Sequence, residues 1–125
     1  MISPDVFLGA LGKKGIRFFT GVPDSLLKHF CTAIENSIST EQHVVAPNEG
    51  AAIGLAIGHY LADGTPAVVY MQNSGLGNAV NPIVSLASTA IYSIPMILVI
   101  GWRGEIDDDG NQIPDEPQHL LQGRL

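Results

Sequence analysis

The segment that decides the fold is VVAPNEGAAIGLAIGHYLADG, residues 44–64. Two valines and an alanine lead into a Pro-Asn turn, where Asn48 is placed to cap a helix that we expect from Glu49 to Asp63. Directly after it, residues 66–71, PAVVYM, are rich in β-branched and aromatic side chains and predict a second strand. Strand, helix and strand in this order are typical of parallel sheets.

The same alternation extends to both sides of this segment. Helices are expected at residues 4–14, 25–37 and most of 79–92, strands at 16–21, 43–46 and 95–101, and a loop at 72–78. Leu26, Phe30 and Ile34 would share the buried face of the second helix. Because the predicted strands are nearly continuous runs of Val, Ile and Leu, we expect a three-layer α/β/α domain with a mostly parallel sheet covered on both faces.

The whole-chain composition excludes several classes of protein. The chain has 125 residues, 46% of them hydrophobic, which suffices for one domain with a core but not for two. A net charge of −6 argues against nucleic-acid binding. The single cysteine, Cys31, excludes an intrachain disulfide, and the N-terminal segment lacks the pattern of a secretory signal. With no apolar run of membrane-spanning length, we expect a cytoplasmic protein that has no membrane partner.

An unusual loop follows each predicted strand: GVPD at 21–24, APNEG at 46–50, QNSGLGN at 72–78 and GWRGE at 101–105. Ligands of parallel α/β sheets bind beyond the carboxyl ends of the strands. The four loops therefore predict a site at one edge of the sheet. Beyond them the sequence is acidic and turn-rich, and we expect the domain, residues 1–125, to be truncated at its C-terminal end.

Some features admit two interpretations on the residues alone. Glu49 is either a functional carboxylate or a charge that gains about 0.3–1 kcal/mol at a helix N-terminus. Gly50, Gly54 and Gly58 recur every four residues, which indicates close approach of another backbone, either within the domain or at a subunit interface. The SGLG segment lacks the third glycine of a dinucleotide-binding loop. The four histidines have no metal-ligand spacing, so no metal site is expected in this chain.

Taken together, the segments APNEGAAIGLAIGHYLADG, MQNSGLGN, YSIPMILVIG and GWRGE are similar to the pyrimidine-binding domain of thiamine-diphosphate enzymes. The similarity spans nearly the whole chain. Within that family, GVPDSLLK, MQNSGLGN, GWRGE and DEPQH together resemble the phosphonopyruvate decarboxylases, while the sulfopyruvate decarboxylases share MQNSGLGN. The resemblance implies the thiamine-diphosphate-binding fold of the pyrimidine-binding type.

The resemblance gives Glu49 a role. In the family, a Glu at this position hydrogen-bonds N1′ of the cofactor's aminopyrimidine, which favours the tautomer that removes the C2 proton, and a buried carboxylate with raised proton affinity suits that exchange. Asn73 and Leu76 match residues that line the pyrimidine. Pro23 and Asp24 match the loop that faces the thiazolium and the substrate. The expected cofactor-binding residues are thus Glu49, Pro23, Asn73 and Leu76.

Two further site residues are expected in the C-terminal part. His119 resembles the segment that supplies active-site histidines in related decarboxylases and would relay a proton; the alternative is a solvated histidine. Arg103 is expected, with Asp24, to bind the substrate, because a guanidinium can hold a phosphonate bidentately. The alternative is an ion pair between Arg103 and Glu105.

The implied reaction is the decarboxylation of 3-phosphonopyruvate to phosphonoacetaldehyde and CO2, in phosphonate biosynthesis. The alternatives are an alpha-type subunit of sulfopyruvate decarboxylase and a non-catalytic α/β assembly domain. The implied cofactors are thiamine diphosphate and Mg²⁺. In the family, the metal and the diphosphate are held by a second domain with a Gly-Asp-Gly start and a downstream Asn, and this chain has neither motif. We therefore expect three partners: a 2-keto acid substrate, a diphosphate-binding domain or subunit, and further copies of the chain in a homo-oligomer. The isolated chain is expected to be inactive.

Overall fold

The computed structural model of the chain describes residues 2–104 and 108–109. Its elements in chain order are α1 (Pro4–Lys13), β1 (Phe19–Gly21), the 3-10 turn η1 (Ser25–Leu27), α2 (Lys28–Ser37), β2 (His43–Val45), α3 (Glu49–Asp63), β3 (Ala67–Gln72), the 3-10 turn η2 (Asn73–Gly75), α4 (Leu76–Pro82), the π-helical turn η3 (Ile83–Ala87) and β4 (Met96–Gly101). This alternation confirms the predicted α/β class.

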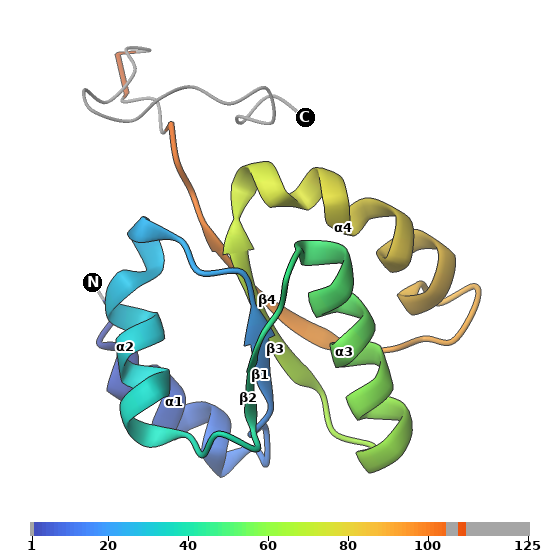
Figure 1. Cartoon of the computed structure of the whole chain (residues 1–125), viewed down its shortest axis with the longest axis horizontal. Coiled ribbons are helices and arrows are strands. Elements are labelled where there is room, and N and C mark those ends of the chain that lie inside the picture. Colours follow the sequence, from blue (N-terminus) through green and yellow to red (C-terminus); the bar gives the residue numbers. More distant parts are fainter. Residues whose placement is uncertain (1, 105–107, 110–125) are drawn as a thin grey trace.

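The four strands form one sheet in the order β2-β1-β3-β4, and every neighbouring pair is parallel. Parallel neighbours require a crossover connection on a face of the sheet. In this fold α1 and α2 cover one face, and α3 and α4 cover the other (Figure 1). The predicted three-layer arrangement is therefore confirmed.

Two apolar clusters fill the space between the layers. Successive residues of a strand point to opposite faces, and every residue of β3 from Ala67 to Met71 is buried. The cluster on one face joins β3 to α3 and α4 through Ala52, Ile53, Ala56, Ile57, Val69, Met71 and Ala79. The cluster on the other face joins β3 to α1 and α2 through Leu8, Leu11, Phe30, Ile34, Val68 and Tyr70. β3 is thus the central strand that both helical layers bury.

The helix α3 has the ends that the sequence predicts. The Asn48 side chain accepts a hydrogen bond from the backbone N–H of Ala51 at 2.9 Å. At the other end, Gly64 has a left-handed backbone (φ 78°), and its N–H donates to the Tyr60 carbonyl at 2.8 Å. A glycine is favoured there because a side chain would strain this conformation. Both caps agree with a helix from Glu49 to Asp63.

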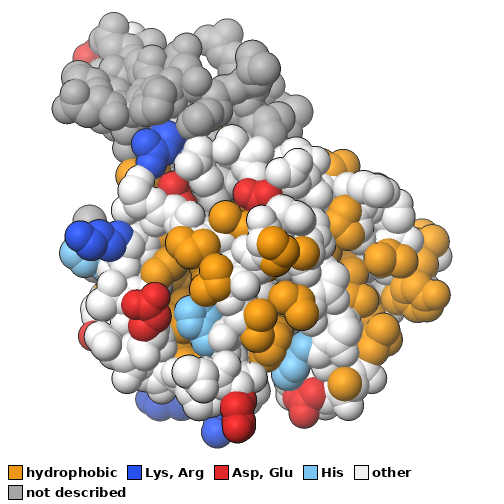
Figure 2. Space-filling model, viewed as in Figure 1, with side chains coloured by type: hydrophobic (Ala, Val, Ile, Leu, Met, Phe, Trp, Pro, Cys, Tyr) orange, Lys and Arg blue, Asp and Glu red, His pale blue; other side chains and the backbone are white. Residues whose placement is uncertain are grey.

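The glycines of α3 do not all pack inside the domain. A Cβ at Gly50 would lie 3.2 Å from the Asn78 carbonyl oxygen, so α4 approaches the start of α3 closely. A Cβ at Gly54 or Gly58 would meet no atom within 4 Å in the part of the chain that the structure describes. The internal-packing interpretation is therefore wrong for Gly54 and Gly58. Figure 2 shows hydrophobic side chains gathered over α3 and α4, and the exposed ones include Leu55, Leu61, Val80 and Val84.

Two local predictions need correction. Leu26 is 42% exposed, not buried with Phe30 and Ile34, because η1 precedes α2 and the tighter 3-10 turn changes the direction of its side chain. The predicted loop 72–78 already contains η2 and the start of α4 at Leu76. Within the described residues, no helix combines the length and apolar content required to cross a membrane.

Candidate functional site

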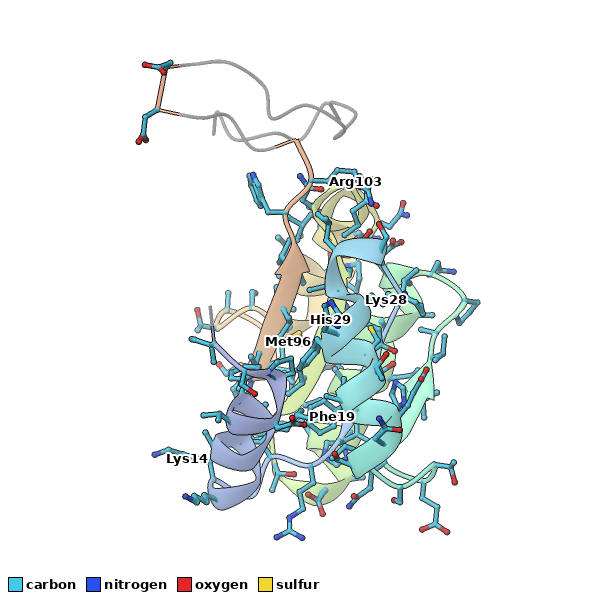
Figure 3. All side chains as sticks on the ribbon, turned by 90° about the vertical axis from the view of Figure 1, so that its left-hand side faces the viewer. Lys14, Phe19, Lys28, His29, Met96 and Arg103 are labelled. Atoms are coloured by element: carbon cyan, nitrogen blue, oxygen red, sulfur yellow. The ribbon has the colours of Figure 1, made fainter. Side chains whose placement is uncertain are left out.

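The carboxyl ends of the four strands meet at one edge of the sheet. Gly21 of β1 lies opposite Tyr70 of β3, and Gln72 of β3 lies opposite Gly101 of β4. Figure 3 shows Arg103, just beyond β4, at this end of the molecule, while Lys14 lies at the opposite end. From β1 the chain turns outward to β2 and then crosses back to β3, so the loops after β1 and β3 diverge. Such a switch point is where open α/β sheets bind their ligands.

Glu49 is the first residue of α3 and is half-buried at this edge. Its Oε2 accepts a hydrogen bond from the Asn78 side-chain amide at 2.8 Å. Among the described residues, Oε1 has no hydrogen-bond partner. The side chain lies directly against Gly75, where any Cβ would overlap the carboxylate. The SGLG segment therefore brings a glycine against a carboxylate, and one carboxylate oxygen is left to accept a ligand proton donor.

Asn73 lies inside the domain, at the start of η2, with 0% of its side chain exposed. Its Nδ2 donates to the Arg103 carbonyl oxygen at 2.9 Å, and its Oδ1 accepts from the Arg103 N–H at 3.4 Å. No surface of Asn73 is accessible in this conformation, and its expected place beside the pyrimidine stays a prediction. Here Asn73 joins the end of β3 to the segment after β4.

Asp24 and Arg103, the two expected substrate ligands, bind each other. Arg103 Nη2 lies 3.5 Å from Asp24 Oδ1, and the Asp24 side chain is only 3% exposed. Asp24 Oδ2 also accepts a hydrogen bond from the Leu26 N–H at 3.1 Å, which caps η1. Arg103 Nη2 donates in addition to the Ser25 hydroxyl. This pair links the loop after β1 to the segment after β4. No local sequence pattern could predict it, because the two residues are 79 positions apart in the chain.

A groove of about 320 Å³ opens beside this ion pair. Its walls are the loop after β1 and the first turns of α2, and it is lined by Pro23, Asp24, Ser25, Lys28, Cys31, Thr32 and Glu35. Pro23 is exposed at its rim. Leu76, by contrast, is half-buried at the start of α4 and packs against the cluster beneath α3. His119 and Glu105 lie outside the described residues.

A cluster of titratable groups lies next to the groove, and sequence reasoning missed it. His43 Nε2 is 2.8 Å from the Tyr70 hydroxyl. Burial lowers the pKa of His43 and raises the pKa of Tyr70. Burial likewise raises the pKa of Cys31, with a further contribution from Glu35. These groups come from α2, β2 and β3, so no local sequence pattern could have identified them. In the described residues, no three His, Cys, Asp or Glu side chains are placed to hold a metal ion.

The fold and the site define a class: a doubly wound α/β domain with an accessible carboxylate at the carboxyl edge of its sheet. Comparison with family models makes the class specific. Residues 3–124 match the model described as "Thiamine pyrophosphate enzyme, N-terminal TPP binding domain". The chain belongs to this family, and the resemblance seen in its motifs is confirmed.

Curated relatives fall into two groups. The chain is 35% identical over all of its 125 residues to a phosphonopyruvate decarboxylase from Streptomyces hygroscopicus, of which it spans 29%. It is 37% identical over 106 residues to the sulfopyruvate decarboxylase subunit alpha of Methanococcus maripaludis, covering 84% of this chain and 61% of that subunit. The chain is therefore much shorter than the first relative and shorter than the second.

Solved structures share the fold. A benzoylformate decarboxylase from Polynucleobacter necessarius superposes with a TM-score of 0.66 at 22% identity, over 82% of this chain and 19% of that one. An enzyme from Mycobacterium smegmatis described as thiamin diphosphate-dependent gives a TM-score of 0.67 at 26% identity, with the same coverage. Both confirm the three-layer architecture of the domain.

Proposed function

We propose that this chain forms the pyrimidine-binding part of a thiamine-diphosphate-dependent 2-keto acid decarboxylase of the phosphonopyruvate or sulfopyruvate type. The observation that carries the proposal is Glu49: a half-buried carboxylate at the switch-point edge of the sheet, with Oε1 unpartnered among the described residues and Oε2 fixed by Asn78. When bound, the cofactor supplies a thiazolium that accepts the electron pair released as CO2 leaves.

The residues present at this edge fit an aminopyrimidine. Glu49 can accept a hydrogen bond from a ring N–H, or hold a proton at Oε1 for exchange with a ring nitrogen. The Asn78 amide keeps the carboxylate oriented, and Gly75 leaves the space in which it lies. Leu76 offers an apolar side chain next to this carboxylate-bearing segment. Pro23 and Asp24 are proposed to face the reacting end of the substrate, from the loop after β1.

For the substrate we propose 3-phosphonopyruvate, converted to phosphonoacetaldehyde and CO2 in phosphonate biosynthesis. Support comes from the similarity to the Streptomyces hygroscopicus protein, which extends over the whole of this chain. Sulfopyruvate is the second candidate, supported by the identity of 37% to the Methanococcus maripaludis subunit. His119 is proposed to relay a proton during the reaction.

The remainder of the site is proposed to come from outside this chain. A diphosphate-binding domain or subunit would hold Mg²⁺ and the diphosphate, as expected for a chain that spans 29% of its phosphonopyruvate decarboxylase relative. We also propose a homo-oligomer and a cytoplasmic location; the single cysteine of the sequence agrees with a reducing compartment.

Glu49→Gln in the complete enzyme tests the proposed function. The amide keeps the shape of the side chain but cannot exchange the proton, so we expect kcat for phosphonopyruvate to fall by about 10²- to 10⁴-fold. Glu41→Gln, an exposed glutamate before β2, is the matched control and should keep wild-type turnover. Near-normal activity of Glu49→Gln would favour a non-catalytic assembly domain.

Turnover assays with phosphonopyruvate and with sulfopyruvate separate the two candidate substrates. A preference of the wild-type enzyme for sulfopyruvate would overturn the phosphonopyruvate assignment while leaving the class of reaction intact. Pyruvate should be a poor substrate, because a site built for a second anion loses those charge-assisted hydrogen bonds when it is empty.

A further inference from the structure

The ion pair between Asp24 and Arg103 is held from several sides. On the carboxylate, Oδ2 accepts from the Leu26 N–H at 3.1 Å while Oδ1 lies 3.5 Å from Arg103 Nη2. On the guanidinium, the same Nη2 also donates to the Ser25 hydroxyl. Arg103 thus contacts two consecutive residues of the loop after β1.

The backbone of Arg103 is fixed in turn by a buried side chain. Asn73 binds both the carbonyl and the N–H of Arg103 and is itself 0% exposed. Gly101, two residues earlier, leaves the space that Asp24 occupies, because a Cβ there would overlap Asp24 Oδ2. Hydrogen bonds and the ion pair therefore connect the carboxyl ends of β1, β3 and β4, and together they hold the Asp24 carboxylate in place.

Asp24 and Ser25 also line the groove beside the ion pair. An ionised carboxylate that is 97% buried needs an opposite charge or several hydrogen-bond donors, and loss of its partner leaves an uncompensated charge. Without Arg103, the buried carboxylate loses its opposite charge, so the loop has to move Asp24 toward water. That movement alters the wall of the groove.

We infer that Arg103 is a positioning residue, which holds Asp24 and Ser25 in the wall of the groove beside the ion pair, and that it is not the ligand of the substrate's phosphonate or sulfonate. The inference rests on the proposed function, since Asp24 is proposed there to face the substrate. It replaces the direct role that the sequence suggested for the guanidinium. Removing a ligand of the anion would mainly raise KM, because substrate affinity falls. Removing a positioning residue would mainly lower kcat, because Asp24 is no longer in place during the reaction.

The test is a double-mutant cycle in the complete enzyme, with Arg103→Gln, Asp24→Asn and the double variant. We expect Arg103→Gln to lower kcat by about 10- to 100-fold while KM for phosphonopyruvate changes less than about threefold. In the Asp24→Asn background, the same substitution should lower kcat by less than about threefold, because it acts through a carboxylate already removed. Arg17→Gln, an exposed arginine at the opposite end of β1, is the matched control.

The outcomes separate this inference from the proposed function. A tenfold or larger rise in KM with unchanged kcat, or losses that multiply in the double variant, would identify Arg103 as a substrate ligand and overturn the inference. If the wild-type enzyme decarboxylates neither acid, the proposed function fails. The coupling between Asp24 and Arg103 is then measured from the melting temperatures of the single and double variants. We expect each single variant to lower Tm by about 2 °C or more and the double variant to add little further. Additive shifts in Tm would show that the two residues act independently.

Discussion

At the scale of single residues, the site depends on glycines that allow carboxylates to approach. Gly75 lies against Glu49, and Gly101 lies against Asp24. Gly75 has a φ of −68° and a ψ of −17°, a conformation that any residue adopts, so the reason for glycine there is space and not backbone freedom. The first glycine of the SGLG segment is thus explained by contact with an acidic side chain.

Gly75→Ala is expected to displace the Glu49 carboxylate, because the added methyl group overlaps it. Since alanine fits the backbone there, we expect the free energy of unfolding to change by less than about 1 kcal/mol. The kcat for decarboxylation by the complete enzyme should fall by about tenfold or more. Gly9→Ala, in α1 with no atom within 4 Å of the added Cβ, is the control. Unchanged kcat in Gly75→Ala would show that the position of Glu49 does not limit the reaction.

At the scale of elements, the sequence predicted what local physics determines. Asn48 and Gly64 mark the ends of α3 by hydrogen-bond and φ requirements that involve only neighbouring residues. Leu26 was misplaced because the prediction extended the α-helical period back to Ser25, whereas residues 25–27 form a 3-10 turn, which has fewer residues per turn. The burial of Asn73 could not be predicted, since its partner, Arg103, is 30 residues away in the chain. Glu49 was identified from its place before a small-residue helix, but its contact with Asn78 required the packing of α4.

The open face of α3 predicts how alanine at Gly54 and Gly58 changes stability and self-association. A Cβ at Gly54 or Gly58 meets no atom of the described residues within 4 Å, so Gly54→Ala with Gly58→Ala should raise the free energy of unfolding of the dilute chain by about 1–2 kcal/mol through helix propensity alone. If copies of the chain associate through this face, the same pair of methyl groups should weaken the association. Urea unfolding and sedimentation velocity measure the two effects.

Gly12→Ala, at an equally open position in α1, is the control for the α3 substitutions. It should leave self-association unchanged. Tighter association of the α3 variant than of the wild-type chain would contradict the proposal that the glycines allow another backbone to approach.

At the scale of the whole molecule, the described residues present one half of the proposed site. The edge of the sheet provides the carboxylate that we propose to bind the pyrimidine and a groove next to Asp24, and the chain spans 29% of the Streptomyces hygroscopicus relative. We therefore predict that the 125-residue chain alone self-associates and shows no measurable affinity for thiamine diphosphate with Mg²⁺. Isothermal titration calorimetry is the measurement. Tight, Mg²⁺-dependent binding to the chain alone would contradict the proposal that a second domain or subunit completes the site.

The contact between Asp24 and Arg103 also has a kinetic consequence. It joins positions 79 residues apart, and the strand that carries Arg103 to the sheet, β4, pairs only with β3 within the described residues. Closing so long a segment costs configurational entropy, so we expect this contact to form late in folding. The residues that line the groove, 23–35, are close together in the chain, but Asp24 would be held by Arg103 only once β4 has joined the sheet. A chain without β4 in place would then present Glu49 while Asp24 is not yet held.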